Sequence, residues 1–317
     1  MCLIAQWGGE AVGELHDILK SLEPSLGPLI GEPAPLEGGI TNRNFRVTLG
    51  AGEYMVRRHG KDTDLLGIDR EAERIASDAA ARLGIAPPVV AALDDGLVTR
   101  FIACRPVGTC ELSDRVEEIA RALRSFHDSR LSLPARFWVP DLLDAYARIV
   151  GVRGGALPDA YRETVAIAAR IVAVLPLGQP YPCHNDLLPG NIIRADDDGR
   201  MMVVDWEYAG MGHPCFDLGN LSVNNDFDDA TDERLLAAYH DEAPSDATRA
   251  ALKLMRVLSD AREAAWGVVQ GVISDLDFDF DGYGREHFER LLAAVGQPDF
   301  EEWLTAARGG EGSGETA

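Results

Sequence analysis

Residues 184–191 read His184-Asn185-Asp186-Leu187-Leu188-Pro189-Gly190-Asn191, which is the pattern H-x-D-x-x-x-x-N. Shortly afterwards, the apolar pair 203–204 predicts a buried strand that presents the acidic segment Asp205-Trp206-Glu207 at its end. Taken alone, the first stretch is typical of a turn and the second of a strand end. Because both occur together at this spacing, the joint pattern favours a catalytic site over a structural turn.

The residue types of this pattern suit the transfer of a phosphoryl group from a nucleotide. Such a transfer needs a base beside the attacking hydroxyl and oxygen ligands for Mg²⁺. Asp186 is predicted to be the base, while Asn191 and Asp205 are predicted to hold the metal.

A glycine-containing segment near the N-terminus offers groups that suit a nucleotide phosphate. Residues 38–44 lie between two predicted strands and carry flexible backbone amides with hydroxyl and amide side chains, among them Gly39, Thr41, Asn42 and Asn44. The alternative is an ordinary hairpin turn. The chain contains neither G-x-x-x-x-G-K-[ST] nor a clear G-x-G-x-x-G, so no P-loop or Rossmann site is indicated.

Two charged residues downstream extend this interpretation. Arg57 lies in the second predicted strand and can reach the α- and β-phosphates, and Glu71, early in the next helix, can pair with it. The alternative is a solvated strand arginine and a helix acid favoured by the helix dipole.

The pattern along the chain predicts an α+β fold of two lobes. A helix over 9–22, strands over 44–49, 54–58, 89–92 and 97–102, and a helix over 69–83 ended by Gly84 give a small antiparallel sheet with one helix packed in its lobe. After residue 105 the chain becomes mostly helical. We therefore expect lobes over 1–104 and 105–308, with the glycine-rich tail 309–317 disordered.

Composition excludes several classes of protein. The 317 residues include 30 basic and 52 acidic side chains, a formal net charge of −22, which argues against a nucleic-acid partner. No run of 18 apolar residues predicts a membrane span. Five scattered cysteines with no C-x-x-C favour reduced thiols, and with no export signal the expected location is cytoplasmic.

With these motifs in place, the sequence resembles the choline/ethanolamine kinases, within the aminoglycoside phosphotransferase-like branch of the protein-kinase-like fold. The resemblance covers residues 30–295 and rests on the loop 38–45, the strand 54–57, Arg70-Glu71, the segments 184–191 and 205–208, Phe216-Asp217-Leu218-Gly219-Asn220, Trp266-Gly267 and Tyr283.

This resemblance implies ATP and Mg²⁺ as cofactors and a role for each matching residue. Asp186 is then the catalytic Asp, and Glu207 joins Asn191 and Asp205 as a further metal or water contact. Arg57, supported by Glu71, binds phosphate, and the segment ending in Phe101 and Ile102 is the hinge near the adenine. The acceptor then lies near Asp186, Glu207, Asn224, Trp266 and Tyr283.

The expected substrate is a small amino alcohol. Aromatic faces at Trp266 and Tyr283, beside acidic residues, suit an alkylammonium group, which puts choline first and ethanolamine second. The alternative is that Trp266 is a core residue of its helix, and the amides Asn224 and Asn225 would suit a primary amine. A kinase for thiamine, an aminoglycoside or a sugar, or a catalytically silent nucleotide-binding protein, are the other hypotheses. The sequence is compatible with a monomer or a homodimer.

Overall fold

A computed structural model describes residues 9–36, 42–50 and 52–308, with side chains described from Leu15 onward. Contacts along the chain divide it into two compact units. Unit 1 comprises Met1–Lys61 and Pro87–Ile102, and unit 2 comprises Asp62–Ala86 and Ala103–Ala317. The expected disordered tail 309–317 and the loop positions Gly39 and Thr41 lie outside the described residues.

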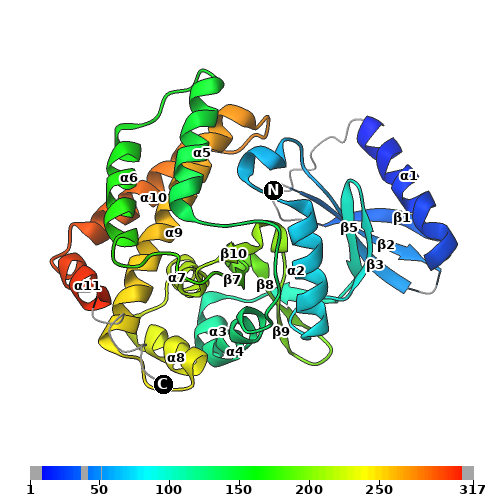
Figure 1. The fold of residues 1–317 in the computed structure, drawn as a ribbon. Helices are drawn as coiled ribbons and strands as arrows, with labels where there is room; N and C mark the ends of the chain where they lie inside the picture. The colour runs from blue at the N-terminus through cyan, green and yellow to red at the C-terminus, as the bar shows by residue number, and fades with distance from the viewer. Residues whose placement is uncertain (1–8, 37–41, 51, 309–317) are drawn as a thin grey trace. The chain divides into compact units, whose positions relative to one another are not determined.

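Unit 1 is an antiparallel sheet with a helix (Figure 1). The strand order is β1-β2-β3-β5-β4. Its elements are α1 (Gly9–Leu26), β1 (Leu29–Leu36), β2 (Arg43–Leu49), β3 (Gly52–Arg58), β4 (Val89–Leu93) and β5 (Gly96–Arg100). The apolar face of α1, including Leu15 and Leu19, is buried in one cluster with Val47, Val56 and Val98 of the sheet. The alternation of apolar residues along β2 and β3 therefore builds this core.

Strand β1 was not expected from the sequence. It contains Pro33 and Pro35, which lack the N–H that a central strand must donate, and it pairs only with β2 at the sheet edge, where a proline is tolerated.

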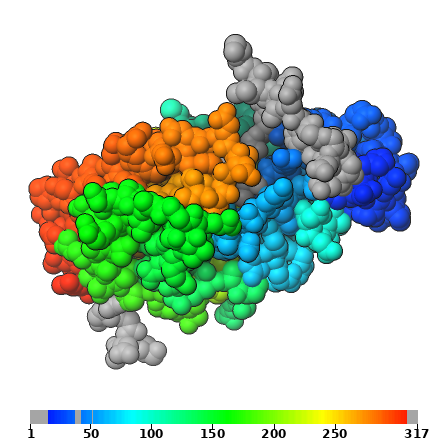
Figure 2. All heavy atoms as spheres, turned by 90° about the horizontal axis from the view of Figure 1, so that it is seen from above, coloured from blue at the N-terminus to red at the C-terminus, as the bar shows by residue number. Residues whose placement is uncertain are grey.

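Unit 2 is mostly helical and is organised around the long helix α9. Helix α9 contacts α5, α6, α7, α8, α10 and α11. The helices of this unit are α2 (Arg70–Arg82), α3 (Thr109–Asp114), α4 (Val116–His127), α5 (Val139–Val152), α6 (Asp159–Val172), α7 (Pro214–Asn224), α8 (Asp229–His240), α9 (Asp246–Ile273), α10 (Phe280–Val295) and α11 (Asp299–Arg308). In the space-filling view the green surface of α5 and α6 adjoins the orange surface of the C-terminal helices (Figure 2).

Short strands and single turns of this unit flank the segments 184–191 and 205–207. The strands β6 (Cys104–Pro106), β8 (Ile192–Ala195) and β9 (Met201–Val203) form one sheet, and β7 (Tyr181–Cys183) pairs with β10 (Gly210–Gly212) in another. The 3-10 turns are η1 (Thr63–Leu66), η2 (Pro189–Asn191) and η3 (Trp206–Tyr208). The pattern 184–191 thus connects β7 to β8, and Asp205 follows β9.

Helix α2 ends where the sequence predicts, but it belongs to the larger unit. Gly84 adopts a left-handed φ of 76°, and the N–H of Ile85 bonds to the carbonyl of Ala80, closing the helix. Its alanine face, including Ala72 and Ala76, is buried in one cluster with Leu123 of α4. The two units therefore differ from the predicted contiguous lobes 1–104 and 105–308, because residues 62–86 pack with unit 2.

The predicted fold class, a small antiparallel sheet followed by a larger helical region, is confirmed. Among the described residues, the structure contains no helix with the length and apolarity needed to cross a membrane.

A tight contact between α7 and α9 makes Gly219 a testable packing position. A Cβ added at Gly219 would lie 2.7 Å from the Cβ of Met255, so the two helices would have to separate. Gly219→Ala should lower the free energy of unfolding by about 1–3 kcal/mol in urea titration. The matched control is Gly151→Ala in α5, where a Cβ meets nothing within 4 Å and should leave stability unchanged or raise it by up to about 1 kcal/mol. Equal destabilisation by both variants would contradict the packing argument.

Candidate active site

One buried carboxylate, that of Asp217, anchors the loop formed by residues 184–191. Asp217 of α7 accepts the backbone N–H of His184 at 2.8 Å and that of Asn185 at 2.7 Å, one on each oxygen. The imidazole Nε2 of His127 lies 2.9 Å from the same carboxylate. Burial opposes the charge of Asp217, but the hydrogen bonds and the two neighbouring histidines keep its pKa below the usual value. The loop therefore has a fixed anionic anchor.

The loop conformation itself is unusual for residues with side chains. Asn185 has a φ of 68°, in the left-handed region, and its amide donates to the carbonyl of Tyr208 at 3.0 Å. His184 accepts the N–H of Asp186 on Nδ1, which leaves Nε2 to donate to the carbonyl of Val204 at 3.0 Å. Strained backbone held by surrounding bonds is common at functional sites. Here it directs Asp186 away from the anchor.

Asp186 is buried and its two oxygens have different partners. Oδ2 accepts Asn191 Nδ2 at 3.0 Å, and Oδ1 accepts Nη1 of Arg262 at 3.0 Å. Burial raises the pKa of Asp186 to about 7; Arg262 lowers it, and the charges of Glu263 and Asp205 raise it further. A carboxylate with a pKa near neutrality suits a general base.

The structure brings the predicted metal-binding residues together. Asn191 donates through Nδ2 to the backbone and side chain of Asp186, so its Oδ1 is turned the other way. The N–H of Val204 bonds to the carbonyl of Asn191 at 2.9 Å, which places Asp205 next to it. Asp205 has a left-handed φ of 66°. Amide and carboxylate oxygens on two adjacent, rigid segments are ligands that suit Mg²⁺.

Glu207 is buried and bonded to helix α2. Arg70 donates from Nη1 to Glu207 at 3.3 Å and to Glu73 at 2.7 Å. Glu207 therefore ties α2 to the D-W-E segment, and its role as a further metal or water contact stays a prediction.

The acid predicted to support Arg57 is placed differently from the expectation. Glu71 is exposed, and both its oxygens accept hydrogen bonds from Arg74, which lowers the pKa of Glu71. The buried acid of this helix is Glu73, at 1% exposure. Glu71 and Glu73 both lie in the first turn of α2, and only packing shows which of the two acids is buried. The support of Arg57 by Glu71 stays a prediction.

The remaining nucleotide positions lie in unit 1. Asn44 of β2 is paired in register with Arg57 of β3, which is buried, as is Asn42. Phe101 and Ile102 follow β5 and are half-buried. Their contacts with a nucleotide remain predictions.

The expected acceptor residues divide into two groups. Trp266 and Tyr283 lie in one cluster, with ring centres 5.5 Å apart, and the hydroxyl of Tyr283 donates to Glu263 at 2.8 Å. Asn224 belongs to another network, because its side chain accepts from Arg290 at 3.0 Å. Asn225 donates to the backbone carbonyls of Leu221, in α7, and of Leu187. The side chains of Asn224 and Asn225 therefore make hydrogen bonds within the fold.

Sequence reasoning missed Arg262 and Glu263. Both are buried on α9, at 2% and 1% exposure, and Arg262 donates to Glu263 at 2.7 Å. The available signal was a pair of adjacent opposite charges followed by the apolar stretch 264–269, since charged residues are rarely buried unless paired.

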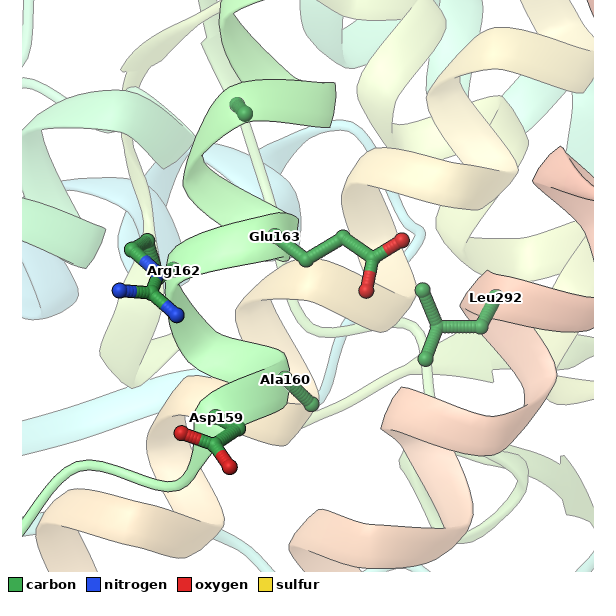
Figure 3. A pocket seen from close by; sticks show the side chains of 6 residues that line it. Asp159, Ala160, Arg162, Glu163 and Leu292 are labelled. Carbon is green, nitrogen blue, oxygen red and sulfur yellow. The ribbon is translucent and has the colours of Figure 1, made fainter.

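Two other places in unit 2 do not extend this site. His127, Cys183 and Asp217 present ligand atoms within 4.8 Å of one another, but both imidazole nitrogens are bonded, to Tyr239 and Asp217. A hollow of about 670 Å³ lies where Glu163 of α6 points toward Leu292 of α10 (Figure 3). Its lining contains none of the residues predicted to be catalytic.

An anchored loop, a buried carboxylate and neighbouring amide and carboxylate oxygens are the features expected of a phosphotransferase with a protein-kinase-like fold. The model of the phosphotransferase enzyme family matches residues 32–255. A probable ethanolamine kinase of Arabidopsis thaliana is 27% identical over 310 residues, covering 86% of this chain and 78% of that protein.

Solved structures share this fold. A choline/ethanolamine kinase family protein from Mesorhizobium loti is 30% identical, with a TM-score of 0.79, covering 94% of this chain and 99% of that one. LicA in complex with AMP, at 23% identity, has a TM-score of 0.71 and covers 88% of this chain and 97% of that one. The chain belongs to the phosphotransferase enzyme family, in its choline/ethanolamine kinase group, and is a small-molecule kinase that acts on a hydroxyl group.

The loop anchor predicts a specific effect of Asp217→Asn. An amide has one acceptor oxygen, so a buried backbone N–H at 184 or 185 loses its partner, which costs about 1–3 kcal/mol. We expect a lower free energy of unfolding by that amount and a lower kcat, measured by urea titration and ATP turnover. The control is Asp228→Asn, because an asparagine also caps the helix that Asp228 starts. Unchanged kcat in Asp217→Asn would remove its role as the loop anchor.

The raised pKa of Asp186 predicts the pH dependence of turnover. Below about pH 7 the carboxyl is increasingly protonated and cannot accept the hydroxyl proton, so kcat/KM for the acceptor should fall as the pH is lowered through this value. Steady-state kinetics across the neutral range measure it. A flat profile down to about pH 5 would contradict the assignment of Asp186 as a buried base.

Proposed function

We propose that this protein transfers the γ-phosphate of ATP to the hydroxyl of a small amino alcohol of the choline and ethanolamine class. The observation that carries the proposal is the buried Asp186, bonded to Asn191 on one oxygen and to Arg262 on the other. A binding protein without activity has no need of a base in this arrangement. The names of the relatives supply the substrate class.

Asp186 performs the proton transfer in this mechanism. Its carboxylate accepts the proton of the acceptor hydroxyl as that oxygen forms a bond to the γ-phosphorus, while the bond from the γ-phosphorus to the β,γ-bridging oxygen breaks and ADP leaves. Asn191 keeps the carboxylate oriented, because its Nδ2 donates to Oδ2 of Asp186 and to the backbone carbonyl of the same residue. The anchor at Asp217 holds the whole loop in place during transfer.

The donor set around Asn191 and Asp205 suits Mg²⁺. Asn191 Oδ1 and the carboxylate of Asp205 would hold the metal, and Glu207 is a further candidate. When bound, Mg²⁺ neutralises charge on the β- and γ-phosphates. Asn42, Asn44 and Arg57 of unit 1 are our candidates for binding the phosphates of ATP.

The base predicts the outcome of Asp186→Asn. An amide cannot accept the proton, so kcat should fall by about 10²-fold or more while the KM for ATP changes little. The measurement is ADP release with ethanolamine, choline, thiamine, a sugar and an aminoglycoside as separate acceptors. Lys253→Gln is the control, because Lys253 bonds to Asp229 and Asp232 away from the site. Wild-type turnover by Asp186→Asn would overturn the base assignment, and turnover of only a non-amine acceptor would overturn the substrate class.

A further inference from the structure

A guanidinium group fills the space beside the catalytic base. Arg262 is 2% exposed, and its Nη1 donates to Asp186 at 3.0 Å and to Glu263 at 2.7 Å. Its Cζ lies 4.2 Å from the centre of the Tyr208 ring. Two carboxylates and an aromatic face are the groups with which proteins bind a cation. The cation position next to the base is therefore filled by the chain's own side chain.

The aromatic residues around this position are bonded to one another. Trp266 donates from Nε1 to the hydroxyl of Tyr208 at 2.9 Å and meets the ring of Tyr283 edge to face, at an interplanar angle of 71°. Trp266 is 6% exposed and packs in the core of unit 2 with Phe280. A quaternary ammonium, which binds through aromatic faces, finds the face of Tyr208 already covered.

One edge of the guanidinium has no protein partner. Nε and Nη2 of Arg262 are buried and make no hydrogen bond to any group in the described ranges. These two donors form the side-on edge that binds oxygen atoms. Because this edge carries unused positive charge, it favours an oxygen of the bound acceptor or of its phosphoryl group and repels any second cation. A quaternary ammonium has no N–H with which to offset that repulsion by hydrogen bonds.

A primary ammonium differs from a quaternary one at this position. Carboxylate oxygens accept more than one hydrogen bond, so Glu263 can accept an N–H in addition to its bonds from Arg262 and Tyr283. Asp186 and Glu263 contact the same nitrogen of Arg262, so they lie close together. An acceptor with two carbons between its hydroxyl and its amine can therefore hydrogen-bond to Asp186 through the hydroxyl and to Glu263 through the amine.

We infer that Arg262 is the acceptor-specificity residue of this kinase: by occupying the cation position formed by Asp186, Glu263 and Tyr208, it selects a primary amino alcohol over a quaternary one. This inference rests on the proposed function and reverses the order of choline and ethanolamine expected from the sequence. It deepens that function by assigning the choice between the two amines to one side chain.

The test compares acceptors in the wild-type enzyme and in two variants at one position. Wild type should have a kcat/KM for ethanolamine at least about tenfold above that for choline. Arg262→Met removes the internal cation, so the ethanolamine-to-choline ratio should fall at least about tenfold. Arg262→Lys retains the charge and should retain the preference for ethanolamine. Arg256→Met, on the same helix but bonded to Asp232, should leave the ratio unchanged.

A second readout does not depend on turnover. Tetramethylammonium chloride should raise the Tm of Arg262→Met above its value in sodium chloride of equal concentration, and should not do so in wild type, because only the variant has an open cation position. If Arg262→Met fails to fold around the unpaired Glu263, the double variant R262M/E263Q removes both charges and takes its place.

The outcomes separate the inference from the function on which it rests. Wild-type preference for choline, or an unchanged ratio in variants that still phosphorylate ethanolamine, overturns the role of Arg262 and leaves the proposed function intact. Turnover of no amino alcohol by wild type overturns the proposed function and the inference with it.

Discussion

The bond between the Asp217 carboxylate and the catalytic loop is the constraint on which the site depends. Two successive backbone N–H groups, of His184 and Asn185, point at one side chain, and this requires the left-handed conformation of Asn185. That conformation in turn directs Asp186 toward Asn191 and Arg262. Burying a carboxylate costs free energy unless its oxygens are hydrogen-bonded. His127 and the two backbone N–H groups supply those hydrogen bonds to Asp217. Helices α4 and α7 are therefore both needed to place one loop.

The position of the loop also depends on how α7 packs against the central helix α9. Glycine at 219 lets α7 approach α9 closely, and Asn220 on the next position bonds to Ser259 of α9 at 2.9 Å. Three residues later along α9, Arg262 reaches the base. The contact between α7 and α9 therefore positions both Asp217, which anchors the loop 184–191, and Arg262, which bonds to Asp186. One packing interface thus supports both parts of the proposed site.

Sequence patterns predict the short segments of this arrangement but not the contacts between residues that are far apart in the chain. The loop 184–191 and Asp205 were identifiable because their chemistry is contained in short segments, and α2 because Gly84 closes it. The edge strand β1 was missed because its two prolines are unfavourable in most strands. Glu71 was chosen because sequence position within a helix turn does not reveal which acid is buried, whereas packing selects Glu73. The adjacent charges at 262 and 263 gave a local signal that Arg262 is paired, but not that it contacts Asp186 and Tyr208, because these partners come from distant segments.

The buried pair Arg262 and Glu263 is difficult to explain by stability alone. Replacing a buried ion pair with apolar residues of similar volume is often neutral or stabilising, by about 1–4 kcal/mol in measured cases, because desolvation offsets the attraction. The pair nevertheless lies on the buried side of α9, and the guanidinium has two donors with no partner in the described part of the chain. Both features are unfavourable in a purely structural core and favourable in a site that must read the charge of a ligand. A side chain that keeps unsatisfied donors next to Asp186, the proposed base, is therefore better explained by what it binds or repels than by what it stabilises.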